Sequence, residues 1–225
     1  MDNVIDSLSI DCVIFGYEDS ELKVLLIKRK KEPDQGRWAL PGGFILKDED
    51  LDESAQRILL ELTGIEGVFM EQVKTFGDVN RYSLRRVITI AHYALIKSEL
   101  YKIKAGALAT EAKWFPVKKV PTSPFDHPTI LLESLTLLQR KLRYEPVGFE
   151  LLPDKFSLTE LQQLYEAILD TTLDKRNFRK KLLKMKLLIQ LNETQQGVAH
   201  RAANLFKFDP KIYTALKNKG FVFEL

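Results

Sequence analysis

The sequence predicts two domains, a mixed α/β domain followed by a winged helix-turn-helix domain. Three observations carry this prediction. The chain has 225 residues, more than the ~100–200 residues usual for one domain. Strand and helix signals alternate over the first two thirds, as in an α/β sheet. The last third reads as helix, turn, helix and hairpin, and it follows a segment with two prolines at 145–156.

The first domain is expected to span residues 1–148 and to form a mixed sheet sandwiched by helices. Its predicted strands, runs of β-branched and aliphatic residues, are 9–15, 22–27, 70–76, 87–96 and 114–115. The first two strands form a hairpin around a polar turn. The capping-box spacing of Asp50 and Glu53 begins a helix, which ends at Gly64. A second, amphipathic helix covers 128–144.

The second domain is expected to span residues 149–225. A capping box at 157–160 begins one helix, and Asp174 caps a second helix after a four-residue turn. Two extended runs follow, 187–191 and 203–208, on either side of a polar tip. A helix, a turn, a helix and a hairpin in this order indicate a winged helix.

Charge is distributed unevenly between the two domains. The chain has 34 basic and 31 acidic residues, and this net charge of +3 excludes a strongly basic coat over the whole molecule. Residues 149–225 alone carry +4, which leaves −1 for 1–148. Seven basic residues and one acid lie within 174–186. Such asymmetry favours nucleic acid as the partner of the second domain.

Cysteine usage and the N-terminal residues bear on the compartment. Cys12 is the only cysteine, which excludes an internal disulfide and a cysteine-based zinc site. The first residues lack the basic n-region of a secretory signal, and no apolar run reaches the ~18 residues of a spanning helix. We therefore expect a cytoplasmic protein with no membrane partner, no metal and no cofactor.

A 23-residue motif begins at Gly43. Its spacing is Gly43-x5-Glu49-x7-Arg57, followed by Leu59-x-Glu61-x-x-Gly64-Ile65, and Trp38-x-Leu-Pro-Gly precedes it. This pattern resembles the Nudix box, and the resemblance implies a Nudix fold for the first domain. Members of that family hydrolyse a diphosphate linked to a second moiety, with magnesium held by helix glutamates.

The positions that hold the metal in that family have changed in this chain. By the resemblance they correspond to Ile58, Glu61 and Leu62, which share one helix face. Magnesium prefers an octahedral shell of oxygen ligands, and one glutamate between two aliphatic residues does not supply it. We therefore expect no catalytic residues and no hydrolase activity, with an active ADP-ribose pyrophosphatase as the alternative. Glu49 and Arg57 suit a structural ion pair equally well.

The second helix of the predicted winged helix has an apolar and a cationic face. Phe178, Leu182 and Met185 follow one another at helical spacing and form the expected buried stripe. Arginine and lysine can reach guanine in the major groove, and asparagine can reach adenine. The candidate DNA-binding residues are Lys175, Arg176, Asn177, Arg179, Lys180, Lys181, Lys184, His200 and Arg201. A solvated lysine-rich face and a surface for an acidic protein are the alternatives.

A degenerate Nudix domain joined to a winged helix resembles the NrtR family of Nudix-related transcriptional regulators. The segments that look like the family's DNA-binding signature are Phe156-Ser-Leu-Thr-Glu-Leu-Gln and Leu173-Asp-Lys-Arg-Asn-Phe-Arg-Lys-Lys-Leu182, and Phe125-Asp-His127 and Phe149-Glu-Leu-Leu152 also match. The resemblance implies a homodimeric repressor that binds palindromic double-stranded operator DNA. It also implies a small-molecule effector that binds the first domain.

The segment from Asp78 to Leu84 bears on the identity of this effector. Family members that bind ADP-ribose often have Asp-Pro-x-Arg-Asp-Pro-Arg here, whereas this chain keeps Arg81 and lacks both prolines and the second arginine. A diphosphate needs metal or arginine partners, while a neutral sugar needs hydroxyl partners over an apolar floor. We therefore expect a pentose, L-arabinose, as in the AraR branch of the family, with ADP-ribose as the alternative.

The fold and the motif together nominate nine effector-binding residues. They are Lys28, Arg29, Trp38, Phe44, Glu61, Arg81, Arg86, His92 and Asp126. Lys28 and Arg29 are adjacent in a strand, so only one of them can face the pocket. A structural role is the alternative for each of the other residues, most of all for Trp38 and His92.

Overall fold

The computed structural model describes residues 3–196, 202–221 and 223, and the chain divides into two compact units. One unit comprises Met1–Glu18 and Leu22–Leu137, and the other comprises Asp19–Glu21 and Leu138–Leu225. The division between Leu137 and Leu138 falls within the helix α2 (His127–Tyr144). The expected domain boundary at 148 lies further along, in the short 3-10 helix η3 (Val147–Leu151).

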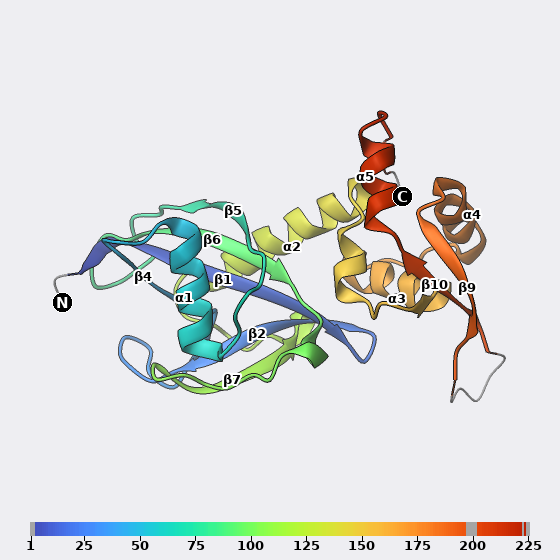
Figure 1. Cartoon of the computed structure of the whole chain (residues 1–225). Helices are drawn as coiled ribbons and strands as arrows, with labels where there is room; N and C mark the ends of the chain where they lie inside the picture. The colour runs from blue at the N-terminus through green and yellow to red at the C-terminus, as the bar shows by residue number, and fades with distance from the viewer. Residues whose placement is uncertain (1–2, 197–201, 222, 224–225) are drawn as a thin grey trace. The chain divides into compact units, whose positions relative to one another are not determined.

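A mixed seven-stranded sheet forms the body of the first unit (Figure 1). Its strands are β1 (Val4–Glu18), β2 (Glu21–Arg29), β3 (Trp38–Ala39), β4 (Gly42–Leu46), β5 (Glu71–Phe76), β6 (Ile88–Leu95) and β7 (Ala109–Pro116). The order β3-β2-β1-β6-β5 is completed by β4, which pairs with β1, and β7, which pairs with β2. β1 and β6 run parallel, whereas the pairs β1–β4, β2–β3, β2–β7 and β5–β6 are antiparallel.

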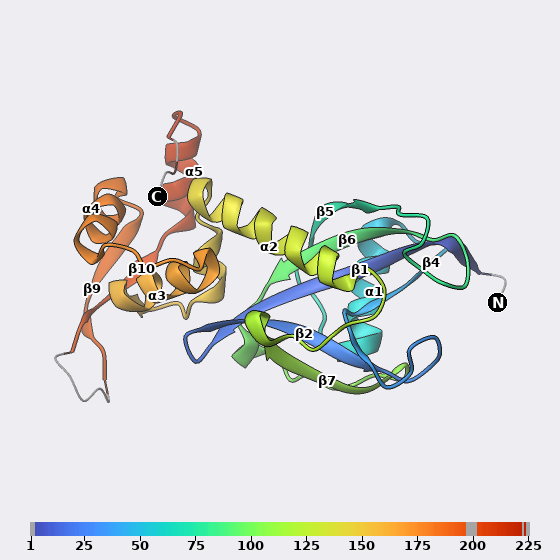
Figure 2. The same ribbon diagram turned by 180° about the vertical axis from the view of Figure 1, so that it is seen from behind.

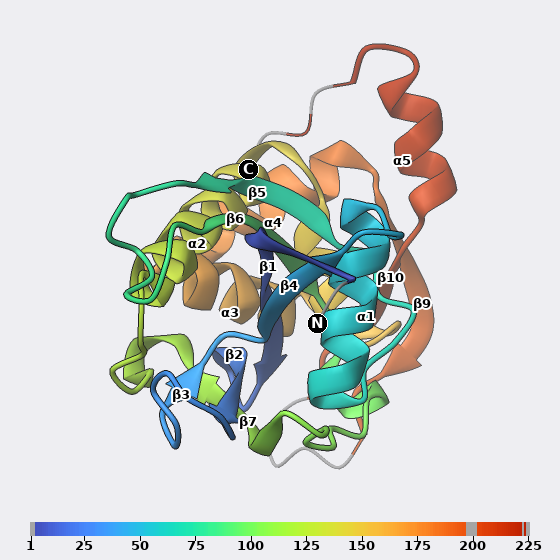
Figure 3. The same cartoon turned by 90° about the vertical axis from the view of Figure 1, so that its left-hand side faces the viewer.

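β1 is the central strand, and its sequence explains why. Residues 9–16 are all buried, because helices cover both faces of the sheet. Neither face is exposed to water, so the strand does not alternate between apolar and polar residues. α1 (Leu51–Thr63) lies on one face and the beginning of α2 lies behind the other (Figures 1, 2 and 3). Asp19 and Ser20 connect β1 to β2 with φ of 54° and 60°, as a type I′ hairpin turn requires. The predicted hairpin and the helix-covered sheet are confirmed.

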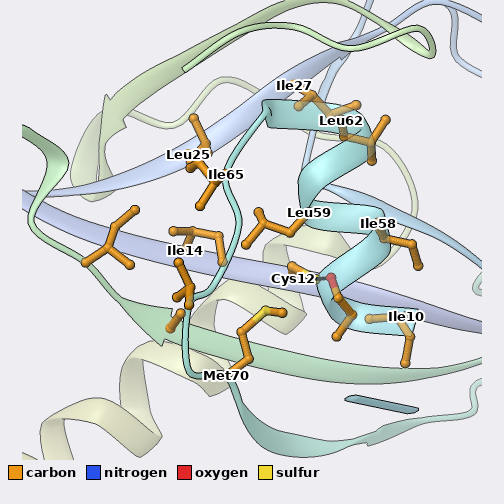
Figure 4. Close-up of a cluster of buried hydrophobic side chains, with 14 of the residues drawn as sticks. Ile10, Cys12, Ile14, Leu25, Ile27, Ile58, Leu59, Leu62, Ile65 and Met70 are labelled. Carbon is orange, nitrogen blue, oxygen red and sulfur yellow. Dashed lines mark hydrogen bonds between the residues drawn. The ribbon is translucent and has the colours of Figure 1, made fainter. Parts of the chain in front are cut away.

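α1 has the ends that the sequence predicts. The carboxylate of Asp50 accepts the backbone N–H of Glu53, and the side chain of Glu53 accepts the N–H of Asp50. Gly64 adopts φ 73° and donates its N–H to the carbonyl of Leu60, which ends the helix. Figure 4 shows Leu59 of this helix directed toward Cys12 and Ile14 of β1 in the main core of the unit.

An ion pair fixes the loop between β4 and α1. Both oxygens of Glu49 accept from Arg57, at 2.7 Å from Nε and 2.6 Å from Nη2, and they also accept from the Leu46 N–H and the Ser54 hydroxyl. Arg57 donates further to the Phe44 carbonyl at 3.0 Å. The hydrogen bonds from Arg57 lower the pKa of Glu49 to about 2, although burial opposes this shift. The Glu49–Arg57 ion pair therefore has a structural role, which is to hold the loop between β4 and α1 in place.

The Leu-Pro-Gly-Gly segment suggests a tight turn from its sequence, but the Gly42–Gly43 pair begins the strand β4 instead. Neither glycine has a positive φ. A Cβ on Gly42 would collide with the carboxylate of Asp11, and one on Gly43 would lie 3.2 Å from the side chain of Ile58. The missing side chains therefore allow β4 to approach β1 and α1 closely.

The second unit is a winged helix, as predicted. Its elements are β8 (Phe156–Ser157), α3 (Leu158–Leu169), α4 (Lys175–Met185), β9 (Leu188–Thr194), β10 (Asn204–Phe208) and α5 (Pro210–Lys217). The strands form an antiparallel sheet of order β8-β10-β9. Ser157 and Glu160 form the predicted capping box, and Asp174 caps α4. The tip of the wing, with Gly197, lies outside the described residues.

Three elements of this unit were not predicted: η3, β8 and α5. β8 has two residues, too few to show a period, and Ser157 belongs to it while capping α3. α5 has eight residues, and its start signal is Asp209 at the N-cap before Pro210. β8 therefore depends on its pairing with β10 more than on its own sequence pattern.

The Glu49–Arg57 pair should make stability depend on pH. Glu49→Gln is expected to lower the free energy of unfolding by about 1–3 kcal/mol at neutral pH, because Arg57 loses its charged acceptor. The carboxyl has a pKa of about 2 when folded against 4.5 for an ordinary glutamate, so its stabilisation is complete above pH 4.5 and is lost as the pH falls toward 2. In urea unfolding at a series of pH values across this range, the free energy of unfolding of the wild type should fall toward that of the variant as the pH is lowered. The exposed Glu66→Gln is the control, and a difference independent of pH would contradict the assignment.

Candidate functional site

A cavity of about 280 Å³ lies in the first unit. Its lining comes from β1, β2, β4, α1, the loop at 77–87 and the start of α2. Ile27, Leu40 and Leu62 contribute apolar walls, and polar groups approach from β1 and from the loop. An apolar cavity with a few convergent polar groups is the usual form of a small-molecule site.

A row of rings follows one side of this cavity. Phe44 stands edge-on to Tyr82 with centroids 6.5 Å apart, Tyr82 lies 5.2 Å from Phe125, and Phe125 lies 5.3 Å from His127. All four residues line the cavity. The flat faces of such rings suit the stacking of a planar or sugar ring.

Three consecutive cations line the cavity at the end of β2. Arg29 donates from Nε to the Pro33 carbonyl at 2.9 Å, and its guanidinium lies 5.2 Å from the centre of the Phe125 ring. Lys30 and Lys31 are exposed and follow it in the lining, together with Glu32. The rim is therefore predominantly positive, which attracts an anionic ligand.

Asp11 lies at the base of the cavity as a buried carboxylate with several partners. It accepts from the Thr89 hydroxyl at 2.8 Å and from Arg81 Nη2 at 3.2 Å, and it lies 3.5 Å from His127 Nε2. Burial alone would raise the pKa of Asp11, but His127, Arg81 and Thr89 together hold it below its ordinary value. The group is thus a carboxylate and requires its partners to remain buried.

The hydrogen bonds of His127 fix the orientation of its ring. Nδ1 accepts the backbone N–H of Leu40 at 3.0 Å. A ring nitrogen that accepts carries no proton, so the proton lies on Nε2, the nitrogen that faces Asp11. His127 is also the first residue of α2. The start of α2 is therefore attached both to the sheet and to the segment before β4.

Arg81 connects the loop at 77–87 to the same network. Its Nε and Nη2 donate to the two carboxylate oxygens of Asp126, at 2.9 Å and 2.7 Å. The Arg81 side chain is 4% exposed and the Asp126 side chain is 19% exposed. A bidentate pair of this kind has a defined geometry.

Three of the nine candidate effector residues line the cavity: Arg29, Phe44 and Arg81. Lys28 does not, because side chains alternate along β2, and it pairs with Glu111 at 2.8 Å. Trp38 packs edge-on against Phe115 with centroids 4.8 Å apart, and Lys28 lies over its ring. Of the two adjacent candidates only Arg29 lines the cavity, as strand alternation predicts, whereas the expected placement of Trp38 in the lining is wrong.

Three further candidates lie away from the cavity, and Asp126 contributes through Arg81 without lining it. Glu61 accepts from Arg57 Nη1 at 3.2 Å. Arg86 donates to two backbone carbonyls of its own loop, at 2.8 Å each. His92 is buried in β6, where desolvation lowers its pKa. These contacts are structural, so Glu61, Arg86 and His92 have the structural role that the sequence analysis gave as the alternative.

The sequence reasoning missed several lining residues. Lys30 and Lys31 follow the expected end of a strand, and Tyr82 follows Arg81 in a loop without periodicity. Phe125 and His127 flank Asp126 within a family motif, and that motif was the available signal for them. Asp11 stood in an apolar strand, where an isolated acid was itself a sign of a buried partner.

The metal-binding face expected of a Nudix helix does not fit magnesium in this chain. Ile58 is 2% exposed and belongs to the core, while Leu62 contributes to the cavity wall. Glu61 is engaged by Arg57. Within residues 3–196, 202–221 and 223, no cluster of three or more histidine, cysteine or acidic side chains could hold a metal ion.

α4 presents the predicted apolar and cationic faces. Phe178 and Leu182 are buried and Met185 is half-buried, and Phe178 packs edge-on against Tyr165 of α3 at 5.5 Å. The exposed candidates on this helix are Lys175, Arg176, Asn177, Lys180, Lys181 and Lys184. These side chains leave one long face of α4 positively charged.

Three candidate DNA-binding residues differ from the rest. Arg179 is half-buried and donates from Nη2 to the Thr159 hydroxyl of α3 at 2.9 Å, so it joins the two helices. This contact corrects its expected exposure on the cationic face. His200 and Arg201 lie outside the described residues. Across the part of the chain that is described, no helix has the length and apolarity needed to cross a membrane.

Two protein families match this chain. The NUDIX domain family matches residues 7–134, and the family described as the NrtR DNA-binding winged helix domain matches residues 148–208. Each match falls on the part of the chain whose fold is described above.

Individual relatives extend over both domains. The ADPR responsive transcriptional repressor NtrR of Acinetobacter baylyi is 32% identical over 205 residues, which are 89% of this chain and 81% of that protein. The crystal structure of Shewanella oneidensis NrtR with a 27mer DNA is 31% identical, with a TM-score of 0.78, and the match covers 92% of this chain and 95% of that one. The NUDIX domain of the same Shewanella protein with ADP ribose is 34% identical, with a TM-score of 0.54, covering 58% and 87%.

Proposed function

Because this chain belongs to the NrtR family, in which a Nudix domain precedes a winged helix, we propose that it is a transcriptional repressor that releases operator DNA when ADP-ribose binds its first domain. The observation that carries the proposal is the similarity over nine tenths of the chain to a relative whose structure holds DNA. The exposed cations of α4 are the groups that would meet that DNA.

The cavity suits the chemistry of ADP-ribose. The ring row formed by Phe44, Tyr82 and Phe125 offers surfaces for an adenine or ribose ring. Lys30 and Lys31 supply positive charge for a diphosphate without a metal ion. The loss of the second arginine in the loop at 77–87 argued for a neutral sugar, but the cations at the end of β2 offset that loss. ADP-ribose, the alternative in the sequence analysis, is thus better supported than L-arabinose.

We further propose that the domain binds ADP-ribose without hydrolysing it. Ile58 and Leu62 occupy two of the family's metal-binding positions, and both are packed among apolar groups. Glu49, the first glutamate in the spacing of the Nudix box, accepts four hydrogen bonds from Arg57, Ser54 and Leu46. Hydrolysis through a magnesium ion would need carboxylates that these contacts and substitutions remove.

Lys30→Ala together with Lys31→Ala should weaken ADP-ribose binding by about tenfold or more, because two charge-assisted contacts to the diphosphate are lost. Calorimetric titration of the purified protein measures the dissociation constant. Lys102→Ala with Lys104→Ala, two exposed lysines of the same unit outside the cavity lining, is the matched control. Heat of binding from L-arabinose and none from ADP-ribose would reverse the assignment of the effector.

Incubation of the protein with ADP-ribose and magnesium or manganese should release no AMP above the rate in buffer. Chromatography of the nucleotide products measures this. The two aliphatic positions on α1 are the physical reason for the expected result. AMP formed in many-fold excess over protein would restore the hydrolase as the function.

Arg176→Ala together with Lys180→Ala should lower DNA affinity at least tenfold and flatten its salt dependence, because fewer counterions are released on binding. The probe is a duplex that the wild-type protein selects from a random pool, and two copies of the chain should select a palindrome. Fluorescence anisotropy over a range of salt concentrations gives both quantities. Lys102→Ala with Lys104→Ala should bind as the wild type does. Unchanged binding by the α4 variant would favour a protein partner for that helix.

A further inference from the structure

The Arg81–Asp126 pair occupies a position from which a ligand could displace it. Arg81 lines the cavity, whereas Asp126 is not part of the lining and directs both carboxylate oxygens at the guanidinium. An anion entering the cavity would be attracted by Arg81 and would compete with Asp126 for the same N–H groups. Arginine binds phosphate through the same paired geometry that it uses for a carboxylate.

Of the two carboxylates that accept from Arg81, Asp126 is the one that an anion can displace. Asp11 also accepts from Arg81, but it is held by the Thr89 hydroxyl and faces His127, and its side chain is 8% exposed. Within the described part of the chain, Arg81 is the only residue that donates side-chain hydrogen bonds to Asp126, whose side chain is 19% exposed. An anion that takes over the guanidinium therefore releases Asp126 before Asp11.

Asp126 also lies at the beginning of α2. Its backbone carbonyl accepts the N–H groups of Thr129 and Ile130, at 2.9 Å and 3.0 Å, so it occupies the N-cap position. α2 then continues without a break to Tyr144, beyond the point at which the chain passes from the first unit to the second. A rearrangement at Asp126 thus acts on the helix that connects the sensor to the winged helix.

We infer that the ion pair between Arg81 and Asp126, here named the Arg81 clamp, is the switch of this regulator. The closed clamp fixes the start of α2 in the DNA-binding form, and the diphosphate of the effector opens the clamp by taking Arg81. This inference rests on the proposed function and adds the residues through which the effector acts. A ligand shifts such an equilibrium only through its different affinity for the two forms, and the competition for Arg81 supplies that difference.

Thermodynamic linkage predicts that loss of the clamp changes two affinities in opposite directions, that for ADP-ribose and that for DNA. Asp126→Asn removes the competing charge, so ADP-ribose no longer has to displace it and should bind about 5- to 50-fold more tightly. The same variant opens the clamp without ligand, so its affinity for the selected duplex in the absence of ADP-ribose should fall by about 5- to 50-fold. Calorimetry measures the first quantity and fluorescence anisotropy the second, both on the full chain.

Glu133→Gln is the matched control for these measurements. Glu133 lies on α2 two turns after Asp126 and pairs with Lys74 of β5 at 2.7 Å, but it does not line the cavity. Its removal breaks an ion pair of the same helix that the effector does not reach. Both affinities of Glu133→Gln should equal those of the wild type.

Asp126→Ser provides a second variant, because serine is a favoured N-cap residue and removes the charge. A circular dichroism melt identifies which variant is folded, and either folded variant should show both changes in affinity. Unchanged affinities for ADP-ribose and for the duplex in a folded variant would overturn the clamp. Weakened DNA binding by the variant, with no binding of ADP-ribose to the wild type, would keep the clamp and reject ADP-ribose as the effector.

Discussion

The buried carboxylate of Asp11 is the constraint on which the sensor domain depends. A charge in the middle of a sheet needs compensation, and the chain supplies it from Thr89 of β6, Arg81 of the loop and His127 of α2. Gly42 leaves room for the carboxylate, because any side chain there would collide with it. One acidic residue therefore positions a strand, a loop and a helix around the same cavity.

The local features of the fold could be predicted from the sequence, whereas the features that depend on distant partners could not. The caps of α1, α3 and α4 and the apolar stripe of α4 depend on residues within a few positions of one another. Phe44 and Arg81 line the cavity as predicted, whereas strand alternation left Lys28 and Arg29 as alternatives, of which Arg29 lines it. Lys30, Lys31 and Tyr82 lie in segments without period, and only the folded loops bring them to the lining. β8 exists only through its pairing with β10.

The helix α1 shows how a motif can survive while its chemistry changes. Glu49 and Arg57 keep the spacing of the Nudix box, and their hydrogen bonds hold the loop before α1 in place. Ile58 and Leu62 replace oxygen ligands with apolar surface, which strengthens packing against Gly43 and the core. In the proposed function, the same fold therefore keeps a cavity for a phosphate-containing effector without the groups that would hold a metal in it.

A sensor benefits from that loss for a thermodynamic reason. Effector binding changes DNA occupancy only as long as the effector remains bound, so a domain that hydrolysed its ligand would lower the concentration that it reports. Without a metal the diphosphate must be held by arginine and lysine, and a cation already paired with a carboxylate can be shared between ligand and protein. Because Arg81 is paired in this way, part of the binding free energy of an anion is used to break the Arg81–Asp126 pair. The affinity for the effector and the strength of its effect on DNA are then set by the same side chains.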